Sequence, residues 1–442
     1  MNACHTCLRG AILIVGIVLL IPSAATLAQE SEGPTSPNPV LEWNQIFIDT
    51  LIATNTPNSS SQRLGAIMHT AIFDAYNGIE RRYTPIFVDS TAPAGASRRA
   101  AVIAAAYTTL VALFPSLSPR QRETLDATYA ASLAALDDDE GVGGASRERG
   151  IAWGTEVALT VLSWRFADGF APVPSPPFTG GQAVGQWRPT GGSCVAMTGF
   201  GLAFTIPFIV PSAAEFDPGP PRGLASATYV DDFNIVKEFG RSANSARSGE
   251  QTPLAPFWEG NASVHWNQAA NQIARANHLS TSASNRLLAV LNIAMADTAF
   301  TIWSAKWHYG SVSTELTWRP VTAIALADTD SNPATAAEPG WAPLVTTPCH
   351  PEYPAGHPAQ NGAAATVLLM SFPDDQTFTL TTPGRPDRTY TSISQARADG
   401  NNARIWGGMH YPSTVMISDA VGEAIAHHVS LNSMRRLHGS PE

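Results

Sequence analysis

The stretch HPEYPAGHPAQNGAAATVLLM, residues 350–370, joins a turn rich in proline and histidine to an apolar run. Pro358 suits the first position of a helix, and residues 363–370 have the composition of a buried helix. His357 would then stand at the helix start, where free backbone N–H groups and the positive end of the helix dipole favour an anion. The stretch predicts a helix start at least, and an anion site if other cations join it.

Two further segments carry such cations. In ARIWGGMHYPSTVM, Arg404 precedes His410 by six residues across a Gly-Gly turn, and a helical pattern follows. In AKWHYGSVSTELTWRPVTAI, Lys306 ends one helical pattern and Arg319 leads into the next segment. Guanidinium, ammonium and helix-start N–H groups are what proteins use to hold oxyanions. We interpret these residues, together with His357, as one site for a tetrahedral or trigonal-bipyramidal oxyanion.

Helical periodicity dominates the rest of the chain. It recurs at residues 40–53, 61–79, 97–114, 119–136, 147–166, 226–239, 258–277 and 281–307. Strand-like alternation appears in TFTL and RTYTSI, between residues 372 and 391, and residues 167–224 are rich in Pro and Gly. We therefore expect an all-α fold, a large helical bundle of two helix-rich halves with long Pro/Gly-rich loops and at most a small β-hairpin.

The first 28 residues have the pattern of a secretory signal. Arg9 precedes an apolar core at residues 11–21, and small residues end near Ala28. No later stretch reaches the roughly 18 uninterrupted apolar residues of a membrane-spanning helix. We expect a secreted or periplasmic protein with three parts: signal peptide 1–28, an N-terminal helical half with the Pro/Gly-rich wrap at 29–225, and a C-terminal catalytic half at 226–442.

Charge and cysteine content narrow the possible partners. The net charge is −10, and Lys and Arg form no run, which excludes the usual footprint for nucleic acid. Cys4 and Cys7 fall within the expected signal peptide, which leaves Cys194 and Cys349. Export permits a disulfide between these two cysteines, but their spacing leaves the pairing open. The sequence also leaves open whether the protein forms a homo-oligomer.

Several motifs give the chain a resemblance to a known superfamily. These are GQWRPT, NIAMADTAFTIWSAKWHY, WRPVTAI, NPATAAEPGW, HPEYPAGH and RIWGGMH. The chain resembles the vanadium-dependent haloperoxidases and type-2 phosphatidic acid phosphatases, in the secreted bacterial haloperoxidase-like branch, and the resemblance covers most of the mature chain. The resemblance implies a vanadate cofactor, with His410 as the vanadate ligand or the nucleophile toward phosphorus and His357 as the acid–base group. The groups that it implies for the equatorial oxygens are Lys306, Arg319, the Gly356 N–H and Arg404.

The chain departs from the superfamily pattern at three places. The interval from Lys306 to Arg319 is thirteen residues rather than seven, which implies an insertion around 310–316 that loops out of the helix. Ala355 replaces a serine whose hydroxyl would contact the anion. Thr414 stands where an acid usually orients the ligand histidine, and Asp419 lies too far round the helix to replace that acid.

These features support three hypotheses of different kinds. The first is a vanadate-dependent haloperoxidase-like enzyme, which oxidises halide with hydrogen peroxide. The second is a soluble acid phosphatase that hydrolyses a phosphate ester through a phosphohistidine. The third is a degenerate oxyanion-binding homologue, which Ala355 and Thr414 would favour.

Overall fold

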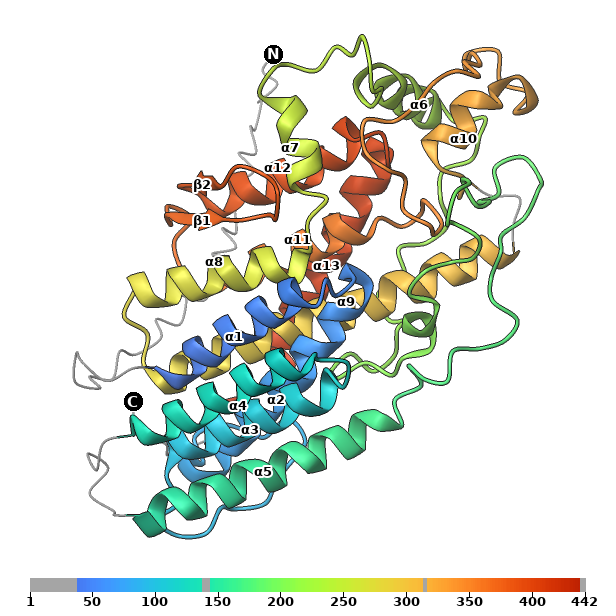
Figure 1. Ribbon diagram of the computed structural model, residues 1–442. Coiled ribbons are helices and arrows are strands. Elements are labelled where there is room, and N and C mark those ends of the chain that lie inside the picture. The colour runs from blue at the N-terminus through green and yellow to red at the C-terminus, as the bar shows by residue number, and fades with distance from the viewer. Residues whose placement is uncertain (1–37, 137–143, 313–315, 438–442) are drawn as a thin grey trace, which may run out of the picture.

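The computed structural model describes residues 38–136, 144–312 and 316–437. The predicted signal peptide, with Cys4 and Cys7, lies outside these ranges. Within them the chain forms thirteen α-helices and one two-stranded sheet (Figure 1). The helices are α1 (Pro39–Ala53), α2 (Asn58–Glu80), α3 (Arg98–Leu113), α4 (Pro119–Ala134), α5 (Gly144–Phe166), α6 (Ala227–Phe239), α7 (Gln251–Phe257), α8 (Ala262–Ala276), α9 (Thr281–Val312), α10 (Pro320–Ala325), α11 (Gly356–Ser371), α12 (Ile393–Trp406) and α13 (Pro412–Asn432).

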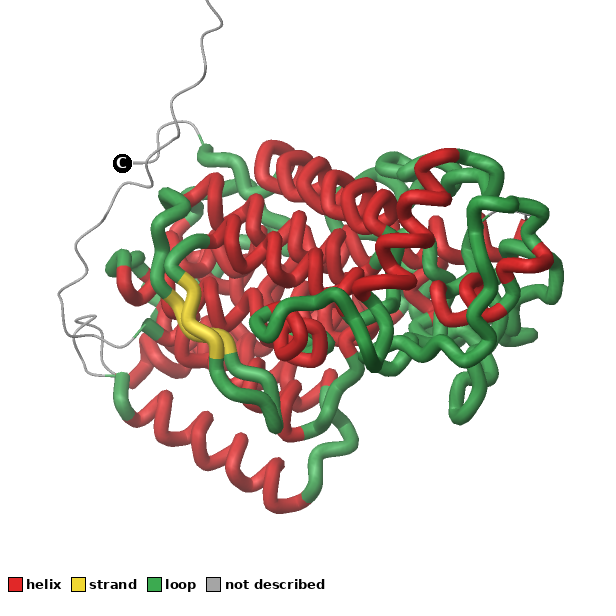
Figure 2. Tube along the Cα trace, turned by 90° about the horizontal axis from the view of Figure 1, so that it is seen from above, coloured by secondary structure: helices red, strands yellow, loops and turns green. Residues whose placement is uncertain are grey.

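The all-α prediction is confirmed. Strands β1 (Phe378–Leu380) and β2 (Arg388–Tyr390) pair antiparallel and form the predicted hairpin, which lies at one edge of the helical body (Figure 2). The helix expected from residue 258 begins at Ala262, because Trp258 still belongs to the end of α7 as its C-cap. Asn261 then caps α8 by accepting a hydrogen bond from the Ser263 N–H.

The long helix α9 forms the centre of the molecule. It packs against α2, α11 and α13, and it runs between the group α1–α5 and the group of α6, α7, α10 and α12 (Figure 1). Residues 281–311 of α9 are long and apolar enough to cross a membrane, but 94% of that apolar window is buried inside the protein. Within this fold α9 is therefore a core helix.

One hydrophobic core draws on most of the described chain. Its buried side chains extend in sequence from Val40 in α1 to Met434 after α13. Both predicted halves contribute to it, and Ser226, at the start of the second half, caps α6. The boundary near residue 225 itself stays a prediction.

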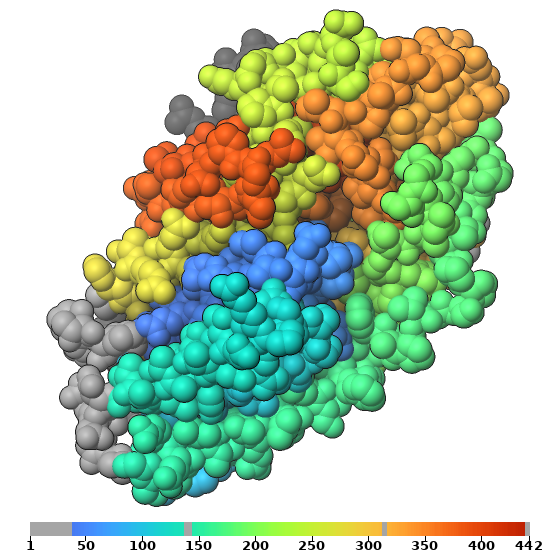
Figure 3. All heavy atoms as spheres, in the orientation of Figure 1, coloured from blue at the N-terminus to red at the C-terminus, as the bar shows by residue number. Residues whose placement is uncertain are grey.

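The Pro/Gly-rich segment wraps one side of the body as extended loop, seen in green beside the orange residues in Figure 3. It is fixed by a disulfide between Cys194 and Cys349, with an S–S distance of 2.05 Å. Next to it, the Thr198 N–H donates to the carbonyl of Cys349, and the indole of Trp303 in α9 donates to the Thr198 carbonyl. The pairing that the spacing left open is formed, and it joins the loop to the residue before His350.

The insertion between Lys306 and Arg319 starts later than expected. Helix α9 continues through Gly310 to Val312, and the chain has left the helix by Leu316. Arg319 follows as the N-cap of α10, in an extended conformation. Lys306 and Arg319 therefore belong to separate elements, so the helical spacing between them does not set their relative direction.

Candidate active site

The residues of the predicted site come from five elements and meet in the interior. Lys306 lies in α9, Arg319 before α10, His357 in the first turn of α11, Arg404 in the last turn of α12, and His410 just before α13. Lys306 and Arg319 are 0% exposed, and Arg404 and His410 are 1% exposed. His357 is only partly buried, so solvent reaches the site on the side where His357 lies.

Lys306 and Arg319 converge on one short turn. The Lys306 ammonium donates to the carbonyls of Pro351 (2.6 Å), Glu352 (3.2 Å) and Pro354. Arg319 donates from Nε to the His350 carbonyl at 2.9 Å. The thirteen-residue interval therefore still brings both cations to residues 350–354.

Arg319 also reaches His410. Its Nη1 lies 3.0 Å from Nε2 of His410 and donates to the Met409 carbonyl at 2.8 Å. A guanidinium can only donate, so Nε2 of His410 accepts with its lone pair. The second nitrogen, Nδ1, lies 2.9 Å from Oε1 of Glu352.

Arg404 borders the other side of the site, with His357 nearby. Its Nη1 donates to the Trp258 carbonyl at 3.1 Å, and its Nη2 lies 3.0 Å from the sulfur of Met409. His357 donates from Nε2 to the Gly260 carbonyl at 3.1 Å. The segment between α7 and α8 thus holds both side chains through its backbone carbonyls.

Glu352 is fully buried next to these cations. Its Oε1 accepts from the Tyr411 N–H at 3.1 Å as well as from His410, and its Oε2 accepts from the Thr414 hydroxyl at 3.1 Å. Asp419 points elsewhere, because it is bound by Arg397 and Asn401, which agrees with the prediction that it cannot replace an acid at position 414.

Burial and mutual repulsion shape the electrostatics. Burial, reinforced by the neighbouring arginines, lowers the pKa of Lys306 well below its usual value, and burial lowers that of Arg319 to about 9 and that of Arg404 to about 10. Burial and the adjacent cations hold the pKa of His410 and His357 well below 6.5. Both imidazoles are therefore neutral at pH 7, inside a cluster of positive charge.

Burial raises the pKa of Glu352 to about 7, although Arg319 opposes this rise. With a pKa of about 7, Glu352 carries only part of its negative charge at pH 7, so it does not balance the three cations Lys306, Arg319 and Arg404. A bound oxyanion would lower the repulsion among Lys306, Arg319 and Arg404.

The site has features that fit an oxyanion held by an imidazole. In the described ranges no side chain caps the start of α11, and the buried Nε of Arg404 has no hydrogen-bond partner. At Gly356 a Cβ atom would come within 3.2 Å of Trp303, so the helix start is kept free of side-chain atoms there. With the lone pair of His410, these are the donors and the ligand that vanadate or phosphate requires.

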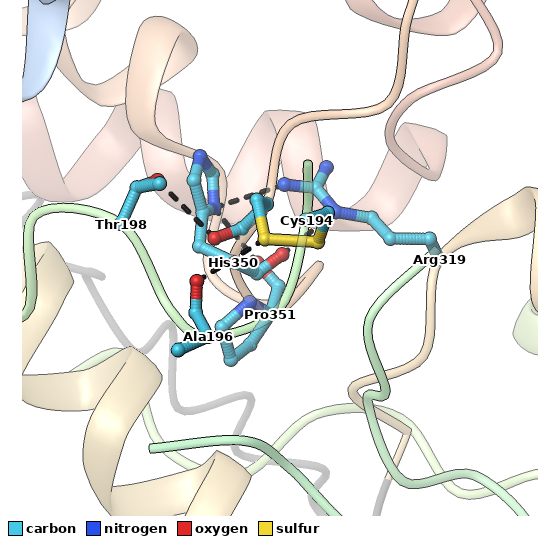
Figure 4. Close-up of a disulfide and its surroundings, with 7 residues drawn as sticks. Cys194, Ala196, Thr198, Arg319, His350 and Pro351 are labelled. Atoms are coloured by element: carbon cyan, nitrogen blue, oxygen red, sulfur yellow. Dashed lines mark hydrogen bonds between the residues drawn. A yellow bond between two sulfur atoms is a disulfide. The ribbon is translucent and has the colours of Figure 1, made fainter. Parts of the chain in front are cut away.

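Two residues of the site were not predicted from the sequence. His350 carries no motif of its own, but its Nδ1 lies 2.9 Å from Nη2 of Arg319, beside the disulfide (Figure 4). Glu352 was not singled out. A signal existed, since Glu352 is an acid within a stretch otherwise suited to burial, but its contact with His410 spans 58 residues.

Comparisons with known proteins bear directly on this fold. Residues 286–439 match the family model of the VCPO second helical-bundle domain. A crystal structure of a bacterial vanadium-dependent iodoperoxidase matches with a TM-score of 0.75 and 22% identity, over 93% of this chain and 100% of that one. The C-terminal part of the chain thus matches this domain model, and the chain as a whole shares the fold of the iodoperoxidase.

Two further solved structures share the haloperoxidase fold. The holo form of a bacterial vanadium-dependent chloroperoxidase has a TM-score of 0.63 and 17% identity, over 84% of this chain and 90% of that one. The apo form has a TM-score of 0.65 and 16% identity, over 84% and 93%. Curated protein sequences give no match. The matched domain includes all the predicted site residues from Lys306 to His410.

Proposed function

We propose that this chain is a vanadate-dependent haloperoxidase, which oxidises halide with hydrogen peroxide. The observation that carries the proposal is the neutral imidazole of His410. Its Nε2 lone pair accepts from Arg319 at a buried position just before α13, within the fold of vanadium haloperoxidases. An imidazole lone pair among buried cations is suited to bind an oxyanion centre.

Each residue would have a defined task. His410 would bind the anion through Nε2, which would exchange its contact with Arg319 for the anion, and Lys306, Arg319, the Gly356 N–H and Arg404 would hold the oxygens. For Lys306 this means exchanging one of its carbonyl contacts for an anion oxygen. Bound vanadate supplies the Lewis acidity that activates hydrogen peroxide toward halide.

His357 would handle the proton. It donates from Nε2 to Gly260 and is neutral, so its Nδ1 is free to accept a proton and return it. The buried arginines stabilise negative charge through donors already in place, which is the largest effect that a preorganised site offers.

The test is an assay of the purified mature protein with hydrogen peroxide, iodide or bromide, and a halogenation indicator. It is run with and without orthovanadate, beside a phosphate-ester assay without vanadate. We expect halide oxidation that depends on vanadate. Ester hydrolysis without halide oxidation would instead indicate the phosphatase, and vanadate binding without either activity the oxyanion-binding homologue.

We also propose that the chain is exported after cleavage near Ala28. The Cys194–Cys349 disulfide supports export, because structural disulfides persist in oxidising compartments. Mass spectrometry of the secreted or periplasmic protein should give an N-terminus close to residue 29, and recovery of the uncleaved chain from the cytoplasm would contradict the proposal.

A further inference from the structure

Because of the third departure from the superfamily pattern, Thr414, the helix α13 that follows His410 offers no acid to orient it. We propose that Glu352, from the turn before α11, is the positioning residue of His410: it fixes the Nδ1–H tautomer and keeps the Nε2 lone pair on the side of Arg319, where the anion would bind. The inference deepens the proposed function and rests on it for the identity of the anion.

The two neighbours of the ring impose the same tautomer. Nδ1 of His410 lies 2.9 Å from Oε1 of Glu352, and a carboxylate oxygen accepts. Nε2 lies 3.0 Å from Nη1 of Arg319, which donates. The hydrogen must therefore be on Nδ1 and the lone pair on Nε2.

The carboxylate is itself held in place from two sides. Tyr411 N–H donates to Oε1 and the Thr414 hydroxyl donates to Oε2, so both oxygens act as acceptors. The backbone of Glu352 donates to the Thr317 carbonyl at 2.9 Å and accepts from Lys306. Glu352 is 0% exposed, so its direction is fixed before any anion binds.

Position 414 explains why the acid can come from another segment. The Thr414 side chain contacts the same carboxylate that contacts His410. An acid at 414 would compete with Glu352 for this space, and two buried carboxylates at contact distance repel each other. Threonine donates to Glu352 instead, so Thr414 holds the carboxylate of Glu352 and Glu352 orients His410.

The first experiment needs no substitution. Nitrogen-15 NMR of the histidine-labelled protein without vanadate should show His410, identified by the signal lost in His410→Gln, as the neutral Nδ1–H tautomer. An Nε2–H tautomer would overturn the inference, whatever the protein's activity.

The second experiment moves the carboxylate. Glu352→Gln should weaken orthovanadate binding by roughly ten-fold or more in a calorimetric titration and should lower the Nδ1–H population, since an amide can also donate to Nδ1. Thr414→Asp alone should lower the melting temperature, because it adds a second acid. The double variant Glu352→Gln/Thr414→Asp should recover both the tautomer and the affinity.

Asp419→Asn is the matched control, since Asp419 lies in α13 with Thr414 and pairs with Arg397 rather than with His410. It should lower stability and leave the tautomer and the affinity unchanged. An unchanged tautomer in Glu352→Gln contradicts the inference while leaving the haloperoxidase proposal intact. A fixed tautomer in a protein that binds no vanadate contradicts only the proposed function.

Discussion

At the scale of single residues, the departures from the superfamily pattern have different consequences. Glu352 compensates structurally for Thr414, as its contact with His410 shows. At Ala355 the structure gives no such substitute: its extended backbone is the N-cap of α11, without a capping side chain in the described ranges, and its N–H donates to the Ser418 hydroxyl. A donor at this position is therefore missing rather than replaced.

Ala355→Ser should restore that donor. Serine suits an N-cap, and a hydrogen bond to a charged group stabilises by roughly 1.5–3 kcal/mol, so orthovanadate should bind about ten-fold tighter or better in calorimetric titration. Ala363→Ser, buried further along α11, is the control and should give no gain in affinity. Unchanged or weaker binding in Ala355→Ser would mean that position 355 does not face the anion.

The sequence allowed the local motifs of the site to be predicted but not its long-range contacts. Lys306, Arg319, His357, Arg404 and His410 each belong to a short motif, and the structure brings them together. The contact between Glu352 and His410 depends on how two distant turns pack, which no periodicity records. The same reason hides the pair formed by His350 and Arg319.

At the scale of elements, most helices of 13 residues or more were predicted, with the 14-residue α12 as an exception, and two short helices were not. The sequence patterns did not predict helices α7, α10 and α12. The first two have seven and six residues, too few for a periodic signal, and such short helices are stabilised by tertiary packing rather than by propensity. The Pro/Gly-rich loop was predicted as a loop, but only the structure shows that the disulfide holds it beside α9 and His350.

The disulfide should contribute strongly to stability. It closes a loop of 155 residues, and removing such a link typically costs about 2–5 kcal/mol. We expect the double variant Cys194→Ser/Cys349→Ser to lower the unfolding free energy by this amount in denaturant titration, with the helical circular dichroism retained. Equal stability of the variant and the wild type would show that the loop is held without the link.

At the scale of the whole molecule, buried titratable groups make stability depend on pH. Burial lowers the pKa of His69 to about 3, and its Nδ1 has no partner among the described residues while Nε2 donates to Asn44. Below pH 6.5 the unfolded chain binds a proton at His69 that the folded protein does not. The stabilisation is thus complete above pH 6.5 and is lost as the pH falls toward 3.

His69→Gln should remove this dependence. Burial raises the pKa of Asp74 and Asp297 to about 6, which acts in the opposite direction, so the informative quantity is the difference between variant and wild type. Between pH 6 and 4 that difference in unfolding free energy should change by about 1.4 kcal/mol per pH unit in favour of the variant. Ile72→Val, buried in the same helix, should show a constant difference, and a constant difference for His69→Gln would contradict the assignment.

The central claim is that the buried cations Lys306, Arg319 and Arg404, together with His410, form a site for vanadate. Calorimetric titration with orthovanadate, comparing the wild type, Arg404→Ala and Arg397→Ala, tests it most directly. Arg404 is buried toward the site, whereas Arg397 in the same helix is paired with Asp419 and Glu423. We predict one vanadate per chain for the wild type and for Arg397→Ala, and affinity lower by roughly 100-fold for Arg404→Ala with its helical content intact. An Arg404→Ala protein that binds vanadate as the wild type does would contradict the account.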